Sequence, residues 1–237
     1  MNIIVTGASR GIGFEIVRSL AGNPGMRILA LARNIKDLRT LKSSCASLPS
    51  GSDVNILATD LAQNDKFQAE VIPVIQKMFD KLNILINNAG YLINKPFNQI
   101  NENELEMTLK VNFMVPWQMI QSLSDLLIKA GKAHVINISS IGGMQGSIKF
   151  PGLSAYSSAK GALAILTECL AAEFNKTGVA FNCLALGAVQ TEMFRQAFPG
   201  YSAPLKPAEI ASFIADFALH GNTFFNGKIL PVSISTP

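Results

Sequence analysis

Residues 3–16 read Ile-Ile-Val-Thr-Gly-Ala-Ser-Arg-Gly-Ile-Gly-Phe-Glu-Ile. The run begins with apolar residues of strand length and continues through a glycine-rich turn into apolar residues at helical spacing, Ile12, Ile16 and Leu20. A strand, a glycine-rich turn and a helix in this order form the unit that binds the phosphates of a dinucleotide. We therefore predict that a βα unit of this kind starts the fold.

Three glycines of the turn have distinct tasks in such a unit. Gly7 permits a tight turn, Gly11 lets the backbone approach a pyrophosphate, and Gly13 lets the helix pack close to the sheet. The helix N-terminus adds amide donors and positive potential. An ordinary glycine loop is the alternative, and the strand before the turn and the helix after it argue against that alternative.

Short apolar runs of strand length recur along the chain, at residues 3–5, 28–31, 54–58, 84–86, 134–138, 179–184 and 229–232. Helical patterns separate these runs, and strands that are apolar without alternation are typical of a parallel sheet covered on both faces. We predict an α/β fold, a doubly wound three-layer sandwich with a central parallel sheet of about seven strands (Rossmann-like). We expect residues 1–237 to form a single domain, in which residues 43–53 are the most loop-like internal stretch.

Composition narrows the class of protein. Hydrophobic residues make up 49% of the chain and charged residues only 15%, so we expect a large core and a surface partly covered by a partner subunit. The 20 basic residues give a net charge of +4 but are spread along the chain, which argues against nucleic-acid binding. Cys45, Cys169 and Cys183 are far apart and lack metal-ligand spacing, so we expect neither a disulfide framework nor a metal site.

The same features predict a cytoplasmic protein. An odd number of scattered cysteines suits a reducing compartment. The first predicted strand follows Met1 directly, so we expect no leader segment, and no apolar run approaches the ~20 residues that span a bilayer.

Four further motifs follow the glycine-rich turn. Asn87-Asn88-Ala89-Gly90 follows a predicted strand, Asn112 lies in a predicted helix, Ser139-Ser140 closes another strand, and Tyr156 and Lys160 stand four residues apart. On a helix, the tyrosine and the lysine would share one face. In these motifs and their order the chain resembles the short-chain dehydrogenase/reductase family, in its single-domain branch with Tyr-x-x-x-Lys. The resemblance spans residues 2–227.

This resemblance implies a site for a nicotinamide dinucleotide. It assigns to the cofactor turn Gly7, Ser9, Arg10, Gly11, Ile12 and Gly13. It places Asp60 and Leu61 beside the adenine, Asn88, Ala89 and Gly90 at the ribose, and Gly187, Val189 and Thr191 near the nicotinamide. It implies a catalytic tetrad of Asn112, Ser140, Tyr156 and Lys160, with Tyr156 and Lys160 also bordering the cofactor. In that tetrad the backbone carbonyl of Asn112 holds a water that relays protons to Lys160.

The chemistry of Tyr156 and Lys160 supports the assignment independently. A carbonyl that accepts a hydride develops negative charge on its oxygen and needs a proton donor. The pKa of a phenol, about 10, is too high for two-way proton transfer at neutral pH. An ammonium about 4 Å away would lower that pKa by up to about 3 units before desolvation opposes the effect. We therefore expect Lys160 to lower the pKa of Tyr156.

Two serines compete to hold the substrate oxygen. We favour Ser140 over Ser139, because the family motif places its serine three residues before a glycine, here Gly143. Ser139 would then be a strand-capping hydroxyl, and the opposite assignment stays open.

The end of the second strand indicates the cofactor. It reads Ala30-Leu31-Ala32-Arg33, without the acid that usually binds the ribose 2′-hydroxyl of NAD, and Arg10 stands in the glycine-rich turn. Two guanidinium groups would suit a 2′-phosphate. We predict that NADP(H) is preferred over NAD(H), and solvated surface arginines are the alternative.

Other features carry less chemistry. His134 and His220 lack any motif context and are expected to be structural or solvated. A Ser-His-Asp triad is not expected, because neither histidine has a serine nucleophile near it in motif context. Leu186 stands where many family members have proline, and the segment between Thr191 and Pro207 is short, so we expect a small substrate cover and an open pocket.

The prediction is an NADP(H)-dependent oxidoreductase that transfers a hydride between nicotinamide and a carbonyl or secondary alcohol. Reduction is the favoured direction, because cellular NADPH is kept reduced. A catalytically silent dinucleotide-binding regulator of the same fold is the second hypothesis, and measurable turnover separates the two. We expect a small-molecule carbonyl or alcohol substrate and a homodimer or homotetramer, formed through the apolar helices at residues 111–128 and 157–174.

Overall fold

The computed structural model, which describes residues 1–63 and 67–234, contains one parallel sheet of seven strands in the order β3-β2-β1-β4-β5-β6-β7. The strands are β1 Asn2–Thr6, β2 Arg27–Ala32, β3 Asp53–Ala58, β4 Ile84–Asn87, β5 Ala133–Ser140, β6 Val179–Leu186 and β7 Lys228–Val232. Each lies at a run that the sequence predicts as a strand. The seven-stranded parallel fold is therefore confirmed.

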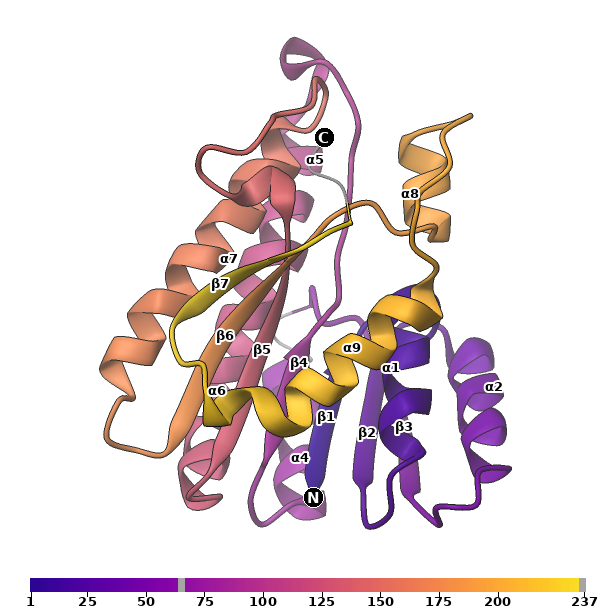
Figure 1. The fold of residues 1–237 in the computed structure, drawn as a ribbon, viewed down its shortest axis with the longest axis vertical. Helices are drawn as coiled ribbons and strands as arrows, with labels where there is room; N and C mark the ends of the chain where they lie inside the picture. The colour runs from indigo at the N-terminus through magenta and orange to yellow at the C-terminus, as the bar shows by residue number, and fades with distance from the viewer. Residues whose placement is uncertain (64–66, 235–237) are drawn as a thin grey trace.

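Helices cover both faces of this sheet and make three layers (Figure 1). One face is covered by α1 Gly11–Ala21, α2 Ile35–Ala46 and α9 Pro207–His220. The other is covered by α4 Ile72–Met78, α6 Val115–Lys129 and α7 Ser154–Glu173. The core is accordingly divided in two by the sheet, which explains why the inner strands are apolar on both faces.

Shorter helical elements connect these layers. They are α5 Glu102–Leu109, α8 Glu192–Ala197, the π-helices Phe67–Val71 and Lys110–Met114, and the 3₁₀ turns Phe97–Gln99, Ile141–Gly143 and Gly221–Thr223. Helix α2 is longer than expected, because it continues to Ala46 and takes up the first part of the stretch predicted as a loop. Within the described residues, no helix has both the length and the apolar character needed to cross a bilayer.

The chain order reverses beside β1, whose neighbours are β2 and β4. At such a reversal the two connecting segments leave the sheet on opposite faces and open a crevice at the carboxyl ends of the strands. In Figure 1 these ends point upward, toward α8. The sheet therefore places the candidate site above β1 and β4.

A buried histidine near the start of β5 links this strand to α9 and to β6, at the end of the sheet away from the crevice. Nδ1 of His134 lies 3.1 Å from the carbonyl oxygen of Ala218 at the end of α9, and Nε2 lies 2.9 Å from Nδ2 of Asn182. Nε2 must accept from the amide of Asn182, so Nδ1 carries the hydrogen and donates to Ala218. Burial lowers the pKa of His134 to about 4. These two hydrogen bonds give His134 a structural role, as the sequence predicts. His220 is exposed and lies beside Asp216.

Strand β7 is one edge of the sheet, and it contains Pro231. The N–H of Gly187 donates to the carbonyl of Val232 (3.0 Å), so Val232 turns its backbone polar groups toward β6. Successive residues of a strand point these groups in opposite directions. Pro231 therefore faces the open edge with a nitrogen that carries no hydrogen.

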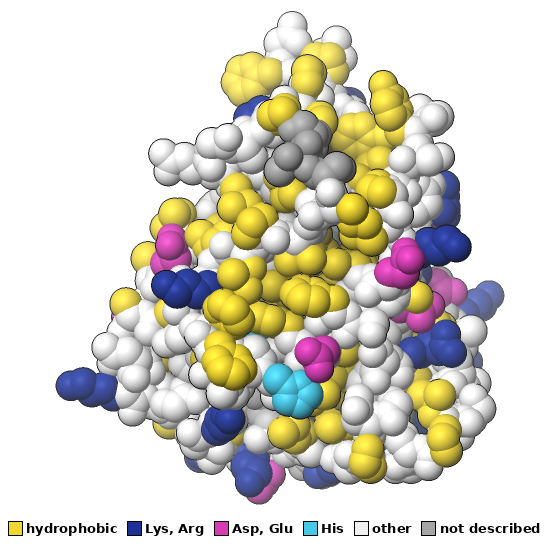
Figure 2. Space-filling view, in the orientation of Figure 1, with side chains coloured by type: hydrophobic (Ala, Val, Ile, Leu, Met, Phe, Trp, Pro, Cys, Tyr) yellow, Lys and Arg dark blue, Asp and Glu magenta, His cyan; other side chains and the backbone are white. Residues whose placement is uncertain are grey.

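Hydrophobic side chains gather over the middle of the face drawn in Figure 2, which is the side of α9 and β7. Phe213 of α9 is 44% exposed, and Phe224 and Ile234 are exposed still further. Apolar area of this extent is unusual for a surface that faces only water.

Candidate active site

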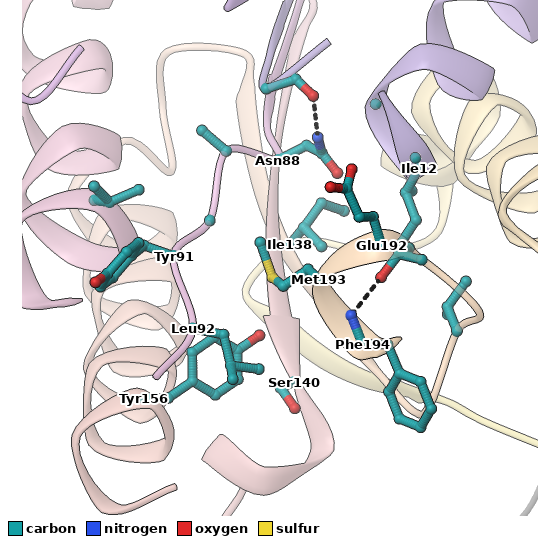
Figure 3. Close-up of a pocket in the computed structure, with 18 of the residues that line it drawn as sticks. Ile12, Asn88, Tyr91, Leu92, Ile138, Ser140, Tyr156, Glu192, Met193 and Phe194 are labelled. Atoms are coloured by element: carbon teal, nitrogen blue, oxygen red, sulfur yellow. Dashed lines mark hydrogen bonds between the residues drawn. The ribbon is translucent and has the colours of Figure 1, made fainter. Parts of the chain in front are cut away.

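A cavity of about 1120 Å³ opens at the carboxyl ends of the strands. It is lined by every site residue predicted from the sequence except Asn112, which is buried beside it. Figure 3 shows Tyr156 and Ser140 toward one end of this cavity and Glu192 and Ile12 toward the other. We call the part lined by the glycine-rich loop the glycine end, and describe it first.

The glycine end is formed mostly by backbone. Gly7 and Gly11 have φ angles of +67° and +58°, which favour glycine. A Cβ on Gly13 would overlap the carbonyl oxygen of Gly7 and lie 2.5 Å from the side-chain amide nitrogen of Asn88. The first turn of α1 thus passes the loop more closely than any side chain permits.

The N-terminus of α1 faces the same part of the cavity. Arg10 is its N-cap residue, and within the described part of the chain its side chain makes no capping bond and the first turn holds no acid. The first-turn amides of a helix lack intrahelical acceptors, so they are available to an anion where the cavity meets Ile12 and Gly13. This backbone cradle fits the pyrophosphate of a dinucleotide.

Thr6 and Asn88 join β1 and β4 beneath that cradle. Oγ1 of Thr6 accepts hydrogen bonds from the N–H groups of Asn88 and Ala89, both at 3.0 Å. Nδ2 of Asn88 donates to the carbonyl of Thr6 at 3.0 Å and to that of Gly7 at 3.3 Å. The two segments on either side of the chain reversal are therefore held in register by side chains of the two predicted motifs.

Beyond the glycine-rich loop, the cavity is bordered by charged residues from the ends of β2 and β3. Arg33 is exposed and forms no ion pair among the described residues. Asp60 accepts from the N–H of Ala62 at 3.1 Å. Asp37 was not predicted, because it follows the strand end by five residues, in the first turn of α2. Its carboxylate accepts a hydrogen bond from Nδ2 of Asn34 at 2.7 Å.

The guanidinium of Arg10 forms an ion pair at the edge of the cavity. Its NH1 lies 2.6 Å from Oε2 of Glu192, at the start of α8. The two residues are 182 positions apart in the chain, and their ion pair joins the glycine-rich loop to the segment that covers the other end of the cavity. The structure thus differs from the expectation of two free guanidinium groups, since Arg10 already has a carboxylate partner.

Tyr156 and Lys160 lie on one face of α7, with Nζ of Lys160 5.8 Å from the centre of the tyrosine ring. Lys160 is 3% exposed, and its ammonium donates to the carbonyl of Ile138 at 2.8 Å. Burial lowers the pKa of Lys160 to about 8 and raises the pKa of Tyr156 to about 12. The expected lowering of the phenol pKa is not seen, because desolvation outweighs the nearby ammonium.

The two candidate serines differ in their bonds. Oγ of Ser139 is buried and donates to the carbonyl of Lys160 at 2.9 Å. Oγ of Ser140 accepts from the N–H of Gly142 at 3.2 Å, and its own hydrogen has no acceptor within the described residues. Ser140 can therefore donate into the cavity, whereas the hydrogen of Ser139 is already used.

Asn112 lies in the π-helix Lys110–Met114 and holds the segment that leaves β4. Its Oδ1 accepts from the N–H of Tyr91 at 3.2 Å, and its Nδ2 donates to the carbonyl of Tyr91 at 2.6 Å. A Cβ built on Gly90 would lie 3.4 Å from that Oδ1 and 3.9 Å from Nζ of Lys160, so both side chains approach Gly90. The side chain is a positioning group here, and the relay through its backbone carbonyl stays a prediction.

The remaining wall, which we call the aromatic end, was not predicted residue by residue. It is formed by Leu92, Phe150, Leu153, Met193, Phe194 and Phe198. In Figure 3, Leu92 lies against Tyr156 and Met193 lies near Ile138. These residues follow β4, β5 and β6, so their position after parallel strands was the available signal, but their loops have no periodic pattern.

Comparisons with known proteins agree with this architecture. The family profile described as short chain dehydrogenase matches residues 1–202. A chloroplastic tropinone reductase homologue of Arabidopsis thaliana is 31% identical, over 98% of this chain and 74% of its own length. The 3-oxoacyl-[acyl-carrier-protein] reductase of Chlamydia trachomatis is 27% identical, over 97% of this chain and 94% of its own.

The fold also matches solved structures. The structure of L-sorbose reductase from Gluconobacter frateurii, complexed with NADPH and L-sorbose, superposes with a TM-score of 0.87 at 22% identity. The match covers 99% of this chain and 95% of that one.

Proposed function

This chain belongs to the short-chain dehydrogenase family of oxidoreductases, and from that premise we propose that it transfers a hydride between a nicotinamide dinucleotide and a carbonyl or secondary alcohol. One observation carries the proposal. Tyr156, Lys160 and Ser140 border the same cavity as a glycine loop whose backbone fits a pyrophosphate. We propose that residues 1–237 act as one catalytic domain.

When bound, the nicotinamide supplies or accepts the hydride. Tyr156 donates a proton to the substrate oxygen, and Ser140 donates a hydrogen bond to the same oxygen. Lys160 holds the ribose and the orientation of the tyrosine, and Asn112 is the proposed relay. Gly7, Gly11 and Gly13 hold the pyrophosphate, with Asn88 fixing the loop.

The protonation state of Tyr156 suits reduction at neutral pH, the direction already favoured because cellular NADPH is kept reduced. With a pKa of about 12, the phenol is protonated at neutral pH and ready to give its proton to a carbonyl oxygen. Oxidation would instead require a phenolate, which burial disfavours. The reverse direction is therefore expected to need a more alkaline solution.

We infer that NADP(H) is preferred over NAD(H), and Arg33 carries that inference. Its exposed guanidinium stands beside the end of β2, where a ribose 2′-phosphate would lie. Asp37 opposes a 2′-phosphate, but its carboxylate is held by Asn34. Arg10 would contribute only after leaving Glu192, so we assign it the smaller share.

The test is the oxidation of NADPH in the presence of ketones, aldehydes, quinones and keto esters, followed at the nicotinamide absorbance. Turnover that depends on the carbonyl compound supports the oxidoreductase. Tight NADPH binding without turnover across the panel would favour a silent dinucleotide-binding regulator.

We also propose that the protein is a homodimer or homotetramer in the cytoplasm. The outer faces of α6 and α7 carry Trp117 at 46% and Ile165 at 59% exposure, and a second apolar area covers α9. Stable subunit interfaces of this kind bury upward of ~2,000 Å². Light scattering at micromolar concentration tests the assembly, and a monomeric mass would contradict it.

A further inference from the structure

The aromatic end of the cavity is enclosed by three segments that hold one another. Nδ2 of Asn94 donates to the carbonyl of Ala197 at 2.7 Å, so the segment after β4 is joined to α8. The N–H of Lys95 donates to the carbonyl of Gly152 at 3.0 Å, which joins it to the segment before α7. This end is therefore built from mutually supporting walls.

Aromatic contacts close the remaining side. The rings of Phe150 and Phe198 meet edge to face with centroids 6.5 Å apart. The rings of Phe194 and Phe198 are 5.1 Å apart within α8 and the residue that follows it. Together with Leu92 and Met193, these rings give the wall of the cavity at this end a hydrocarbon surface. Of these residues, Leu92 lies against Tyr156 (Figure 3).

The charged side chains that line this end are either buried or paired. Lys160 is buried beneath the tyrosine ring and donates to the carbonyl of Ile138. Glu192 is paired with Arg10 at 2.6 Å. Among the described residues that line the cavity, the other charged groups are Arg33, Asp37 and Asp60, which all lie beyond the glycine-rich loop. Lys149, next to Phe150, is outside this lining and donates to the carbonyl of Gly142 at 2.9 Å. An anionic substrate would find beside the catalytic tyrosine only the buried ammonium of Lys160, and a cationic substrate would find only a carboxylate that already has a partner.

From these observations we propose that the substrate is a neutral, mainly apolar carbonyl compound, and that the cavity discriminates against carboxylates, phosphates and protonated amines. This inference rests on the proposed hydride transfer. Burying an ion without a partner is strongly unfavourable, and burying apolar surface against the phenylalanines is favourable. We expect a neutral ketone to exceed a charged analogue of the same shape by about 100-fold or more in kcat/KM.

The test uses two pairs of substrates that differ in charge and little in shape. One pair is methyl 4-oxocyclohexanecarboxylate and the free 4-oxocyclohexanecarboxylate. The other is 4-isopropylcyclohexanone and the protonated 4-(dimethylamino)cyclohexanone. Rates are measured with saturating NADPH at pH 7. A charged member within about threefold of its neutral partner, or above it, would overturn the proposal.

A binding measurement separates this proposal from the proposed function. Ligand-observed NMR titrations of the same four compounds report occupancy of the cavity without chemistry. If no compound is turned over but the neutral pair binds and the ions do not, hydride transfer fails and the neutral cavity stands. Binding of the ions equal to that of the neutral compounds, or no binding by any of the four, overturns the neutral cavity itself.

A charge introduced into the wall gives a gain-of-function test. Phe150 is 37% exposed at the rim of the aromatic end, so Phe150→Lys leaves the core intact and places a cation there. We expect the ratio of carboxylate to methyl ester kcat/KM to rise at least about tenfold. The control is Val74→Lys, on α4 and outside the cavity lining, where the side chain is 40% exposed, and it should leave the ratio unchanged. Equal ratios in both variants and the wild type would contradict the proposal.

Discussion

The two ends of the cavity are built by different means. At the glycine end the walls are backbone, with left-handed glycines and a helix N-terminus whose amides face the cavity. At the aromatic end the walls are side chains on irregular segments, held by Asn94 and by rings such as Phe198. Backbone donors suit the cofactor phosphates, which are the same in every enzyme that uses the cofactor. Side chains can be exchanged by mutation, so they suit the substrate, which varies between enzymes.

The electrostatics differ in the same way. The glycine end gathers an open helix N-terminus and Arg33, and both favour phosphate groups. At the aromatic end the buried ammonium of Lys160 donates to the carbonyl of Ile138, and the carboxylate of Glu192 is paired with Arg10. Tyr156 borders the cavity that the two ends share, so one residue is expected to connect a charged ligand with a neutral one.

The largest effect is expected at this junction. Tyr156→Phe deletes the proton-donating hydroxyl and keeps the ring, so NADPH oxidation should fall about 10²- to 10⁴-fold while NADPH affinity, followed by fluorescence titration, is retained. Lys160→Met should slow turnover and also weaken NADPH binding, because Lys160 is proposed to hold the ribose. Retention of more than about a tenth of the wild-type rate by Tyr156→Phe would show that the acid/base assignment is wrong.

Gly13→Ala should affect the glycine end alone. The new methyl would overlap the carbonyl of Gly7, and relieving that overlap is expected to lower the free energy of unfolding by about 1–3 kcal/mol and to weaken NADPH binding. Denaturant unfolding and NADPH titration measure both quantities. The control is Gly22→Ala at the end of α1, where φ is −65° and the nearest atom lies 3.2 Å away. Similar losses in both variants would show that the loop has no special requirement for glycine.

The arginines sharpen the comparison within the glycine end. Arg33→Ala should weaken NADPH about tenfold or more and leave NADH almost unchanged, since a charge-assisted contact contributes about 1.5–3 kcal/mol. Arg10→Ala should have a smaller effect, because its guanidinium must first leave Glu192. The measurement is the dissociation constant of NADPH and of NADH for each variant and for the wild type. Equal losses for NADPH and NADH in Arg33→Ala would show that it does not read the 2′-phosphate.

His134 provides a reference region far from both ends. Its folded pKa of about 4 lies below the unfolded value of 6.5, so below pH 6.5 the unfolded chain binds a proton that the folded chain excludes. Stability should therefore fall with acid, by about 1.4 kcal/mol between pH 7.5 and 5.5 from this group. In His134→Gln, the difference in the free energy of unfolding between the two pH values should be smaller by that amount. The exposed His220→Gln should keep it, and an unchanged pH dependence in His134→Gln would exclude the mechanism.

What could be predicted from the sequence follows the same division. Strand runs and the glycine-rich turn are local patterns, and the spacing of Tyr156 and Lys160 on α7 follows from helical periodicity. The ion pair of Arg10 and Glu192 joins residues 182 positions apart. It depends on where α8 lies relative to the glycine-rich loop, and a local sequence pattern carries no information on that position. The pKa of Tyr156 depends on burial, and burial was unknown before the fold. Asp37 was missed because its position depends on the first turn of α2.

Pro231 has a consequence for the behaviour of the protein at high concentration. A strand from another molecule that docked along β7 would find no hydrogen-bond donor at this position, so its ladder would be interrupted midway. At the opposite edge, β3 begins with Asp53, whose carboxylate accepts a hydrogen bond from Nδ2 of Asn55. A charged side chain therefore stands on this edge strand. Both rims of the sheet thus resist edge-to-edge aggregation, and subunits that associate near β7 must do so through side chains such as those of α9.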